Sequence, residues 1–286
     1  MFNHKKELQF EAKPDAPNPL YAKYIQELIG GQYGEMSVAM QYLFQGWSCR
    51  GEEKYRDMIM DIATEELGHV EMLATMVARL LEDAPVIQQE EVMKQDPMVK
   101  ALISGMNPQH AIVAGLGPRP ADSVGNPWSG AYIIASGNLL ADFRANLNAE
   151  SQGRLQVARI YEMIEDKGVR DLLAVLLARD SYHQNLWMTA VKELEEKEGG
   201  ILVPTTFPRD KERFDIAYDF YNLSEGDASK DGPWAKGEAL DGQGDYNWQA
   251  DPKPEAKAPK LKPVTPKMYG TPDLPDQVGF QKDNPE

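Results

Sequence analysis

The chain has 286 residues, 42% of them apolar, which is enough for one large domain or two small ones with a substantial core. Its formal net charge of −15 disfavours nucleic acids and anionic membranes as partners. The single cysteine, Cys49, excludes an internal disulfide framework and indicates a reducing compartment. No apolar stretch approaches the roughly 20 residues that span a bilayer, and the N-terminus lacks a signal core, so we expect a soluble, cytoplasmic protein.

The N-terminal residues 1–18 are expected to form an extended arm, because three prolines oppose an early helix. Apolar periodicity then predicts four long helices, over about residues 21–50, 53–82, 130–165 and 168–198. Glycines and prolines are dense between 97 and 128, which predicts a long crossover with at most short helices. Gly199 and Gly200 are expected to end the last helix.

A helical hairpin, a crossover and a second hairpin make an all-α chain with the connectivity of a ferritin-like four-helix bundle, assigned here to residues 19–200. The remaining segment, 201–286, holds more than half of the prolines and no sustained periodicity, yet it carries many aromatic residues. We expect an extended, largely irregular arm that wraps the bundle or a neighbouring subunit, with a solvated linker best matched by 251–262.

Two of the predicted helices carry an apolar stripe that contains one carboxylate and one histidine three residues later. The pairs are Glu66 with His69 and Asp180 with His183. Residues three apart lie one turn apart on the same helix face. Burying such groups costs free energy unless they are paired or bind a metal, so the two stripes predict a dinuclear metal site inside the bundle.

The first and third helices each place one carboxylate on their apolar face, Glu35 and Glu150. Glu35 precedes Glu66 by 31 residues and Glu150 precedes Asp180 by 30, which indicates a duplicated helical hairpin. The glycines Gly31 and Gly153, one turn from these carboxylates, are expected to leave room for a cluster and bridging solvent. Carboxylate and imidazole ligands together suit manganese or iron, and zinc less specifically.

Some candidate residues keep two interpretations. Asp180 has a short side chain, so it either binds the metal or holds His183 or bridging water as an acceptor. Glu65, one residue off the stripe, is expected to be solvated or interfacial. His4 and His110 fall in arm and loop segments without such a context, and Cys49 is interpreted as a small buried residue.

The sequence resembles the manganese catalases in three segments, Gly-Gly-Gln-Tyr-Gly-Glu ending at Glu35, Thr-Glu-Glu-Leu-Gly-His ending at His69, and Asn-Ala-Glu-Ser-Gln-Gly-Arg-Leu-Gln-Val-Ala-Arg around Glu150. This resemblance covers nearly the whole chain. It implies disproportionation of hydrogen peroxide to water and dioxygen at two manganese ions per chain. The ligands that it implies are Glu35, Glu66 and His69 for one ion, and Glu66, Glu150 and His183 for the other.

The resemblance also implies a tyrosine near the cluster in the substrate channel. Tyr42 fits this role, because it lies two turns beyond Glu35 on the same face, although core packing is an alternative. Bridging solvent with Glu66, Glu150 or Asp180 nearby is the expected proton acceptor. Some family members pair an arginine before the helix-three glutamate with a glutamate on the last helix. Here these positions are Ala149 and Asp180, so Arg144 or Arg154 would have to substitute.

Some family members bind calcium at a subunit interface, and the resemblance implies one possible calcium ion per chain. Its candidate ligands are Asp57, Asp61, Asn222, Ser224 and Gly226. Paired carboxylates and loop carbonyls suit a hard cation, while a solvated face is the alternative for the two aspartates. The family resemblance further implies a homo-oligomer, namely a hexamer.

Two other functions use a similar core. A ferritin-like iron-oxidising or iron-storage protein shares the carboxylate and histidine ligands, but it would not need the long C-terminal segment. A di-iron oxygenase would need an electron-donating partner. An iron store accumulates many metal ions per chain and an enzyme about two, so metal content separates storage from catalysis.

Overall fold

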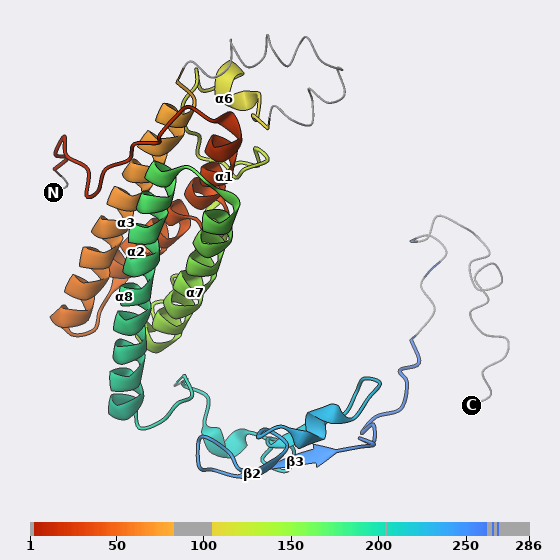
Figure 1. Cartoon of the computed structure of the whole chain (residues 1–286). Helices are drawn as coiled ribbons and strands as arrows, with labels where there is room; N and C mark the ends of the chain where they lie inside the picture. Colours follow the sequence, from red (N-terminus) through yellow and green to blue (C-terminus); the bar gives the residue numbers. More distant parts are fainter. Residues whose placement is uncertain (1–2, 83–104, 204, 262–264, 266–267, 269–286) are drawn as a thin grey trace. The chain divides into compact units, whose positions relative to one another are not determined.

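The computed structural model describes residues 3–82, 105–203, 205–261, 265 and 268. The chain divides into two compact units, Met1–Thr205 and Thr206–Glu286, each of which is described by itself (Figure 1). Parts of the predicted crossover, at 97–104, and of the predicted C-terminal arm, at 269–286, lie outside the described residues. Among the helices that are described, none is long and apolar enough to cross a membrane.

The first unit is helical. Its elements are α1 (Pro19–Gly30), α2 (Glu35–Ser48), α3 (Glu53–Leu80), α6 (Gln109–Ile112), η1 (Gly130–Tyr132), α7 (Leu139–Met163) and α8 (Lys167–Glu198). α2 packs against α3 and α7 packs against α8, and the two pairs meet where α2 contacts α7 and α3 contacts α8 (Figure 1). α1 also packs against α3.

The predicted single helix over 21–50 is wrong, because the chain breaks between α1 and α2. Gly31 and Gly34 both leave helical geometry, with ψ angles of 169° and 168°. At Gly30 a side chain would collide with the crossover, since an added Cβ would lie 2.4 Å from the carbonyl oxygen of Ala121. The break makes Glu35 the first residue of α2 and aims it at the interior, where it is buried.

The third predicted helix begins at Leu139 rather than near 130, because the chain before it is bound by side chains of α2. Gln41 accepts a hydrogen bond from the backbone N–H of Ile134 at 2.9 Å, and Gln45 donates one to its carbonyl at 2.8 Å. Asn138 then caps α7 by accepting from the N–H of Ala141 at 2.9 Å. The predicted end of the last helix is confirmed, since Gly199 follows α8 with a φ of 75°, a value that favours glycine.

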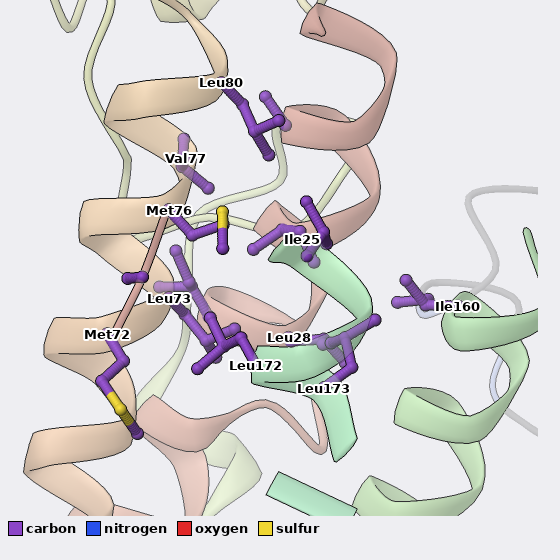
Figure 2. Packing of buried hydrophobic residues seen from close by; sticks show 14 of the residues in the cluster. Ile25, Leu28, Met72, Leu73, Met76, Val77, Leu80, Ile160, Leu172 and Leu173 are labelled. Atoms are coloured by element: carbon purple, nitrogen blue, oxygen red, sulfur yellow. The ribbon is translucent and has the colours of Figure 1, made fainter. Parts of the chain in front are cut away.

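Two apolar clusters fill the interior of the helical unit. One, part of which is shown in Figure 2, includes Ile25, Leu28, Leu73, Met76 and Leu173. The other is made by residues such as Tyr42, Ile59, Phe143, Trp187 and Leu194. Burying each large apolar side chain contributes about 1.5–3 kcal/mol, so these clusters fix the helix packing.

Along each long helix, the predicted ligands lie between the two apolar clusters. On α3 the buried apolar residues between Ile59 and Ala63 belong to one cluster, and those between Met72 and Leu80 belong to the other. Glu66 and His69 lie between these two groups. The same order holds on α8, where His183 lies between Leu176 and Trp187. The polar site is therefore enclosed by apolar packing above and below it.

The second unit contains a small sheet rather than only irregular chain. Its strands are β1 (Asp219–Tyr221), β2 (Lys236–Glu238) and β3 (Asp245–Gln249), and its short helices are η2 (Arg209–Lys211) and η3 (Ala228–Asp231). The strand order is β1-β3-β2, with β1 parallel and β2 antiparallel to β3. Asp241 accepts hydrogen bonds from Arg209 at 2.9 Å and Tyr218 at 3.0 Å, which tie the loops of this unit together.

Candidate metal centre

Five predicted ligands from four helices meet in the interior of the helical unit. Their carboxylate oxygens and imidazole nitrogens form two groups whose atoms lie within 4.8 Å of one another. One group is Glu35, Glu66 and His69, and the other is Glu66, Glu150 and His183. All five are buried, and Glu66, His69 and His183 are 0% exposed. The two groups share Glu66, which is the arrangement that a pair of bridged metal ions requires.

The distances repeat across the site with Glu66 at its centre. One oxygen of Glu66 lies 2.6 Å from Nδ1 of His69, and the other lies 2.7 Å from Nδ1 of His183. The outer carboxylates are further away, with Glu35 3.8 Å from Nδ1 of His69 and Glu150 3.6 Å from Nδ1 of His183. The two imidazole rings are stacked with centroids 6.0 Å apart. Both histidines thus present the same nitrogen to the shared carboxylate.

Tyr42 lies against one half of this arrangement. Its hydroxyl donates a hydrogen bond of 2.6 Å to Glu150, and it is completely buried. Its ring packs 5.1 Å from that of Trp187, which also packs on Phe143. The side chain therefore combines core packing with a polar contact to a candidate ligand, so the two interpretations of Tyr42 are not exclusive.

The electrostatics of the group favour a bound cation. Burial and the nearby Glu66 raise the pKa of Glu35 to about 8. Burial also raises the pKa of Glu150, with Glu66 adding to the shift. For His183, burial opposes the charged form, but contacts with Glu150, Glu65 and Glu66 raise its pKa to about 12. Several ionised carboxylates that are buried close together repel one another unless a positive charge lies between them.

The polar atoms of the group fit a metal. Oε1 of Glu66 and Nδ1 of His183 are buried and lie 2.7 Å apart, but neither makes a contact with hydrogen-bond geometry. Buried polar atoms of this kind are costly unless something binds them. Imidazole and carboxylate are the donors that manganese, iron and zinc accept in proteins. The residues present therefore fit a pair of transition-metal ions.

Asp180 lies beside the site but outside both ligand groups. It is buried, and its Oδ2 has no hydrogen-bond partner. Burial, with Glu35, Glu150 and Glu66 adding to it, raises the pKa of Asp180 to about 9. Asp180 also lines a small cavity of about 10 Å³, room for about one water molecule. The other lining residues are Leu28, Tyr33, Glu35, Val38, Ala149, Glu150, Gly153 and Val157.

The arginines considered as substitutes have other partners. Arg144 donates to Glu195 at 2.6 Å and also to the carbonyl of Ile201. Arg154 donates to Ser181 at 2.9 Å. Neither lines the cavity beside Asp180, so Asp180 keeps its unpartnered oxygen.

Of the two glycines expected to leave room near the carboxylates, Gly31 does not border the cavity beside Glu35 and Glu150, whereas Gly153 does. A Cβ on Gly31 would lie 2.6 Å from the carbonyl oxygen of Glu27, in the turn behind it. On Gly153 it would lie 3.4 Å from the carbonyl oxygen of Tyr33. Gly31 serves the break before α2, while Gly153 lets α7 pack close to the segment between α1 and α2 and lines the cavity.

Glu65 was missed by the sequence reasoning, which expected it to be solvated or interfacial. It is half-buried, and its carboxylate lies 3.6 Å from Nε2 of His69 and 3.3 Å from Nε2 of His183. Arg179 on α8 donates two hydrogen bonds to it. The adjacent glutamates in Thr-Glu-Glu-Leu-Gly-His were a signal, but only the fold shows that position 65 reaches a second helix.

Other predicted residues lie away from the metal centre. His4 is exposed and contacts Glu71, while His110 is buried with its Nδ1 2.8 Å from the carbonyl of Gly117. Cys49 is half-buried at the end of α2.

The residues considered for calcium come from both compact units. Asp57 and Asp61 are exposed on α3, and Ser224 and Gly226 are exposed in the second unit, where Asn222 is half-buried. Among the described residues, neither group of potential metal ligands includes any of these five.

Comparison with known proteins agrees with this geometry. The family model described as manganese containing catalase matches residues 1–282. A manganese catalase of Bacillus subtilis strain 168 is 58% identical over 271 residues, with 95% of this chain and 98% of the relative covered. One from Lactiplantibacillus plantarum is 43% identical and covers 94% and 98% of the two chains.

A solved structure is also similar. The crystal structure of a manganese catalase from Anabaena PCC7120 superposes with a TM-score of 0.68 at 28% identity, and the match covers 88% of this chain and all of the other. The family model spans nearly the whole sequence, and the buried carboxylates and histidines are consistent with the metal in its name. The chain therefore belongs to the manganese catalase family.

Proposed function

We propose that this chain binds two manganese ions and disproportionates hydrogen peroxide to water and dioxygen, which makes it a manganese catalase. The observation that carries the proposal is the pair of buried ligand groups sharing Glu66. Relatives named manganese catalase, at 43% and 58% identity over nearly the whole chain, support the same activity.

In the proposed site, Glu35 and His69 would hold one ion, Glu150 and His183 would hold the other, and Glu66 would be shared by both groups. When bound, the manganese pair supplies Lewis acidity and two redox equivalents per turnover. The apolar clusters on either side limit the entry of water, which strengthens electrostatic interactions within the site.

The remaining side chains handle position and protons. The cavity lined by Ala149, Gly153 and Asp180 marks the side from which peroxide is proposed to approach, because it borders Glu35 and Glu150. Tyr42 fixes Glu150 through its 2.6 Å hydrogen bond. Asp180, whose raised pKa favours a bound proton, is proposed to exchange protons with bridging solvent beside the reacting peroxide, with Glu66 and Glu150 nearby.

Oxygen evolution tests this proposal directly. We expect protein produced with manganese to release one dioxygen per two peroxides without added reductant, and to lose this activity when the metal is removed. Glu66→Ala and His69→Ala are expected to lose bound manganese and activity together, whereas Glu71→Gln, an exposed site on the same helix, should keep both. Full activity in metal-free protein would reject the proposal, and many iron ions per chain would favour iron storage.

Several features of the wider protein belong to the same proposal. The packing of α2, α3, α7 and α8 supports a ferritin-like four-helix bundle over 19–200. Residues 1–18 are proposed to be an N-terminal arm, and 201–286 an arm that wraps the bundle or a neighbouring subunit. A cytoplasmic location is proposed from the single cysteine.

Calcium binding and a hexamer are proposed from the family resemblance. The candidate calcium ligands are Asp57, Asp61, Asn222, Ser224 and Gly226. These residues come from both compact units. Equilibrium dialysis with calcium, before and after Asp57→Asn with Asp61→Asn, would test the site, and sedimentation would give the size of the assembly.

A further inference from the structure

Glu65 and Glu66 are neighbours on α3, and each carboxylate faces both histidines. Glu66 approaches the Nδ1 atoms at 2.6 Å and 2.7 Å. Glu65 approaches the opposite ring nitrogens, with Oε1 3.6 Å from Nε2 of His69 and Oε2 3.3 Å from Nε2 of His183. The two stacked imidazoles thus lie between two carboxylates, one at each end of the rings.

The Nε2 atoms need an acceptor. Both are buried and lack a hydrogen-bond partner, although a carboxylate oxygen lies near each. An imidazole that gives Nδ1 to a metal keeps its proton on Nε2, and metal-binding histidines usually donate that proton to a carboxylate, a carbonyl or water. Glu65 offers one oxygen to each ring, so it can supply the acceptor for both Nε2 protons.

Arg179 fixes the carboxylate of Glu65 from the other side. Its Nε donates to Oε1 and its Nη2 donates to Oε2 at 3.0 Å, which is a two-point contact in one plane. The guanidinium also lies over the ring of Tyr182, 4.7 Å from its centroid. Each oxygen of Glu65 therefore faces both Arg179 and the Nε2 atom of one histidine.

We propose that Glu65, held by Arg179, is a single positioning residue for both histidine ligands and presents their two Nδ1 atoms to the two metal ions at once. This inference rests on the proposed ligand set. If each histidine had its own acceptor, the two metal sites would be independent. With one shared carboxylate, the geometry of the first metal site depends on that of the second. Loss of Glu65 should therefore weaken both sites together.

The substitution Glu65→Gln tests the shared role. It keeps the size of the side chain but replaces one oxygen with an NH2 group. Whichever way the amide turns, the NH2 group faces a donor of Arg179, so the two-point contact that holds Glu65 against both histidines is lost. The pair lies at a surface pocket of about 530 Å³, and the side chain of Glu65 is 25% exposed and that of Arg179 39%, so the variant has room to fold. We expect about 10–100-fold weaker manganese binding at both sites.

Manganese affinity by titration with a competing chelator, with the manganese EPR spectrum as a second readout, measures the effect on the full-length protein. Arg179→Lys keeps the positive charge but only one contact point, so its affinity should fall between those of the parent and Glu65→Gln. Glu71→Gln on the same helix is the matched control and should bind manganese like the parent. The metal-free parent and variants should have the same free energy of unfolding. If Glu65 only stabilised the fold, the metal-free variants would instead be less stable than the parent.

The outcomes separate this inference from the ligand set. If Glu65→Gln binds both ions like the parent, or loses only one of them, the shared positioning role is wrong. His183→Ala is measured in parallel. If it also binds two ions like the parent, the proposed ligands themselves are wrong. Weak binding in both variants, with both ions lost together in Glu65→Gln, supports the ligand set and the shared role.

Discussion

At the residue scale, Asp180 is a buried carboxylate without a compensating cation. Burial, with Glu35, Glu150 and Glu66 nearby, raises its pKa to about 9 in the metal-free fold, against about 3.9 in an unfolded chain. The folded chain therefore keeps a proton that the unfolded chain releases. Its contribution to stability is fully present below about pH 4 and is lost as the pH rises towards 9.

Asp180→Asn should remove this dependence. The neutral amide is expected to stabilise the metal-free protein at pH 8 by about 1–3 kcal/mol relative to the parent, because the parent must take up a proton at Asp180 on folding and the variant need not. The gain should be smaller at pH 5. Urea unfolding of both proteins at the two pH values measures it. An equal difference at pH 5 and pH 8 would contradict this assignment.

At the scale of elements, the contact between α1 and the crossover should be sensitive to a single methyl group. A Cβ on Gly30 would lie 2.4 Å from a backbone atom of Ala121, and Gln26 holds the same segment by donating to the carbonyls of Arg119 and Ala121. We expect Gly30→Ala to destabilise the fold by about 1–3 kcal/mol, since backbone must move to admit it.

Gly130→Ala is the matched control, because a Cβ there would meet nothing within 4 Å. Chemical unfolding of the two variants measures the difference. A Gly30→Ala protein as stable as Gly130→Ala would show that the crossover shifts freely at this point.

The sequence predicted α3 and α8 well because each carries an uninterrupted apolar stripe that ends at recognisable residues. It also predicted the five proposed ligands, which lie on those stripes or on the apolar faces of the other two bundle helices. It failed at 31–34, where helix breaking depends on the crossover packed against Gly30, and at 130–138, which Gln41 and Gln45 hold outside the helix. Glu65 was missed for the same reason, since its partner Arg179 comes from another helix. Contacts between distant segments decided each of these cases.

At the scale of the whole molecule, bound metal should contribute measurably to stability. Ions that bind only the folded chain stabilise it by about 2.7 kcal/mol for each site filled at a hundred times its Kd. With about 2–4 °C of Tm per kcal/mol, removing both manganese ions should lower the Tm by about 10–20 °C.

Calorimetry before and after treatment with a chelator tests this, and adding manganese back should restore the Tm. If the Tm stays constant while the metal content falls to zero, bound metal does not stabilise the fold.

The formal net charge of −15 is compatible with this chemistry. Hydrogen peroxide is uncharged, so a negative surface does not repel it, while the same surface raises the local concentration of divalent cations.

The break between α1 and α2 has a further consequence for the duplicated hairpin. Glu35 is the first residue of α2, next to a helix N-terminus, whereas its counterpart Glu150 lies in the middle of α7. The partial positive charge of a helix N-terminus draws electron density from a carboxylate, and the middle of a helix exerts no such effect. The two ions of the pair would therefore have donors of unequal strength, so the halves of the site would differ in redox potential although their ligands match.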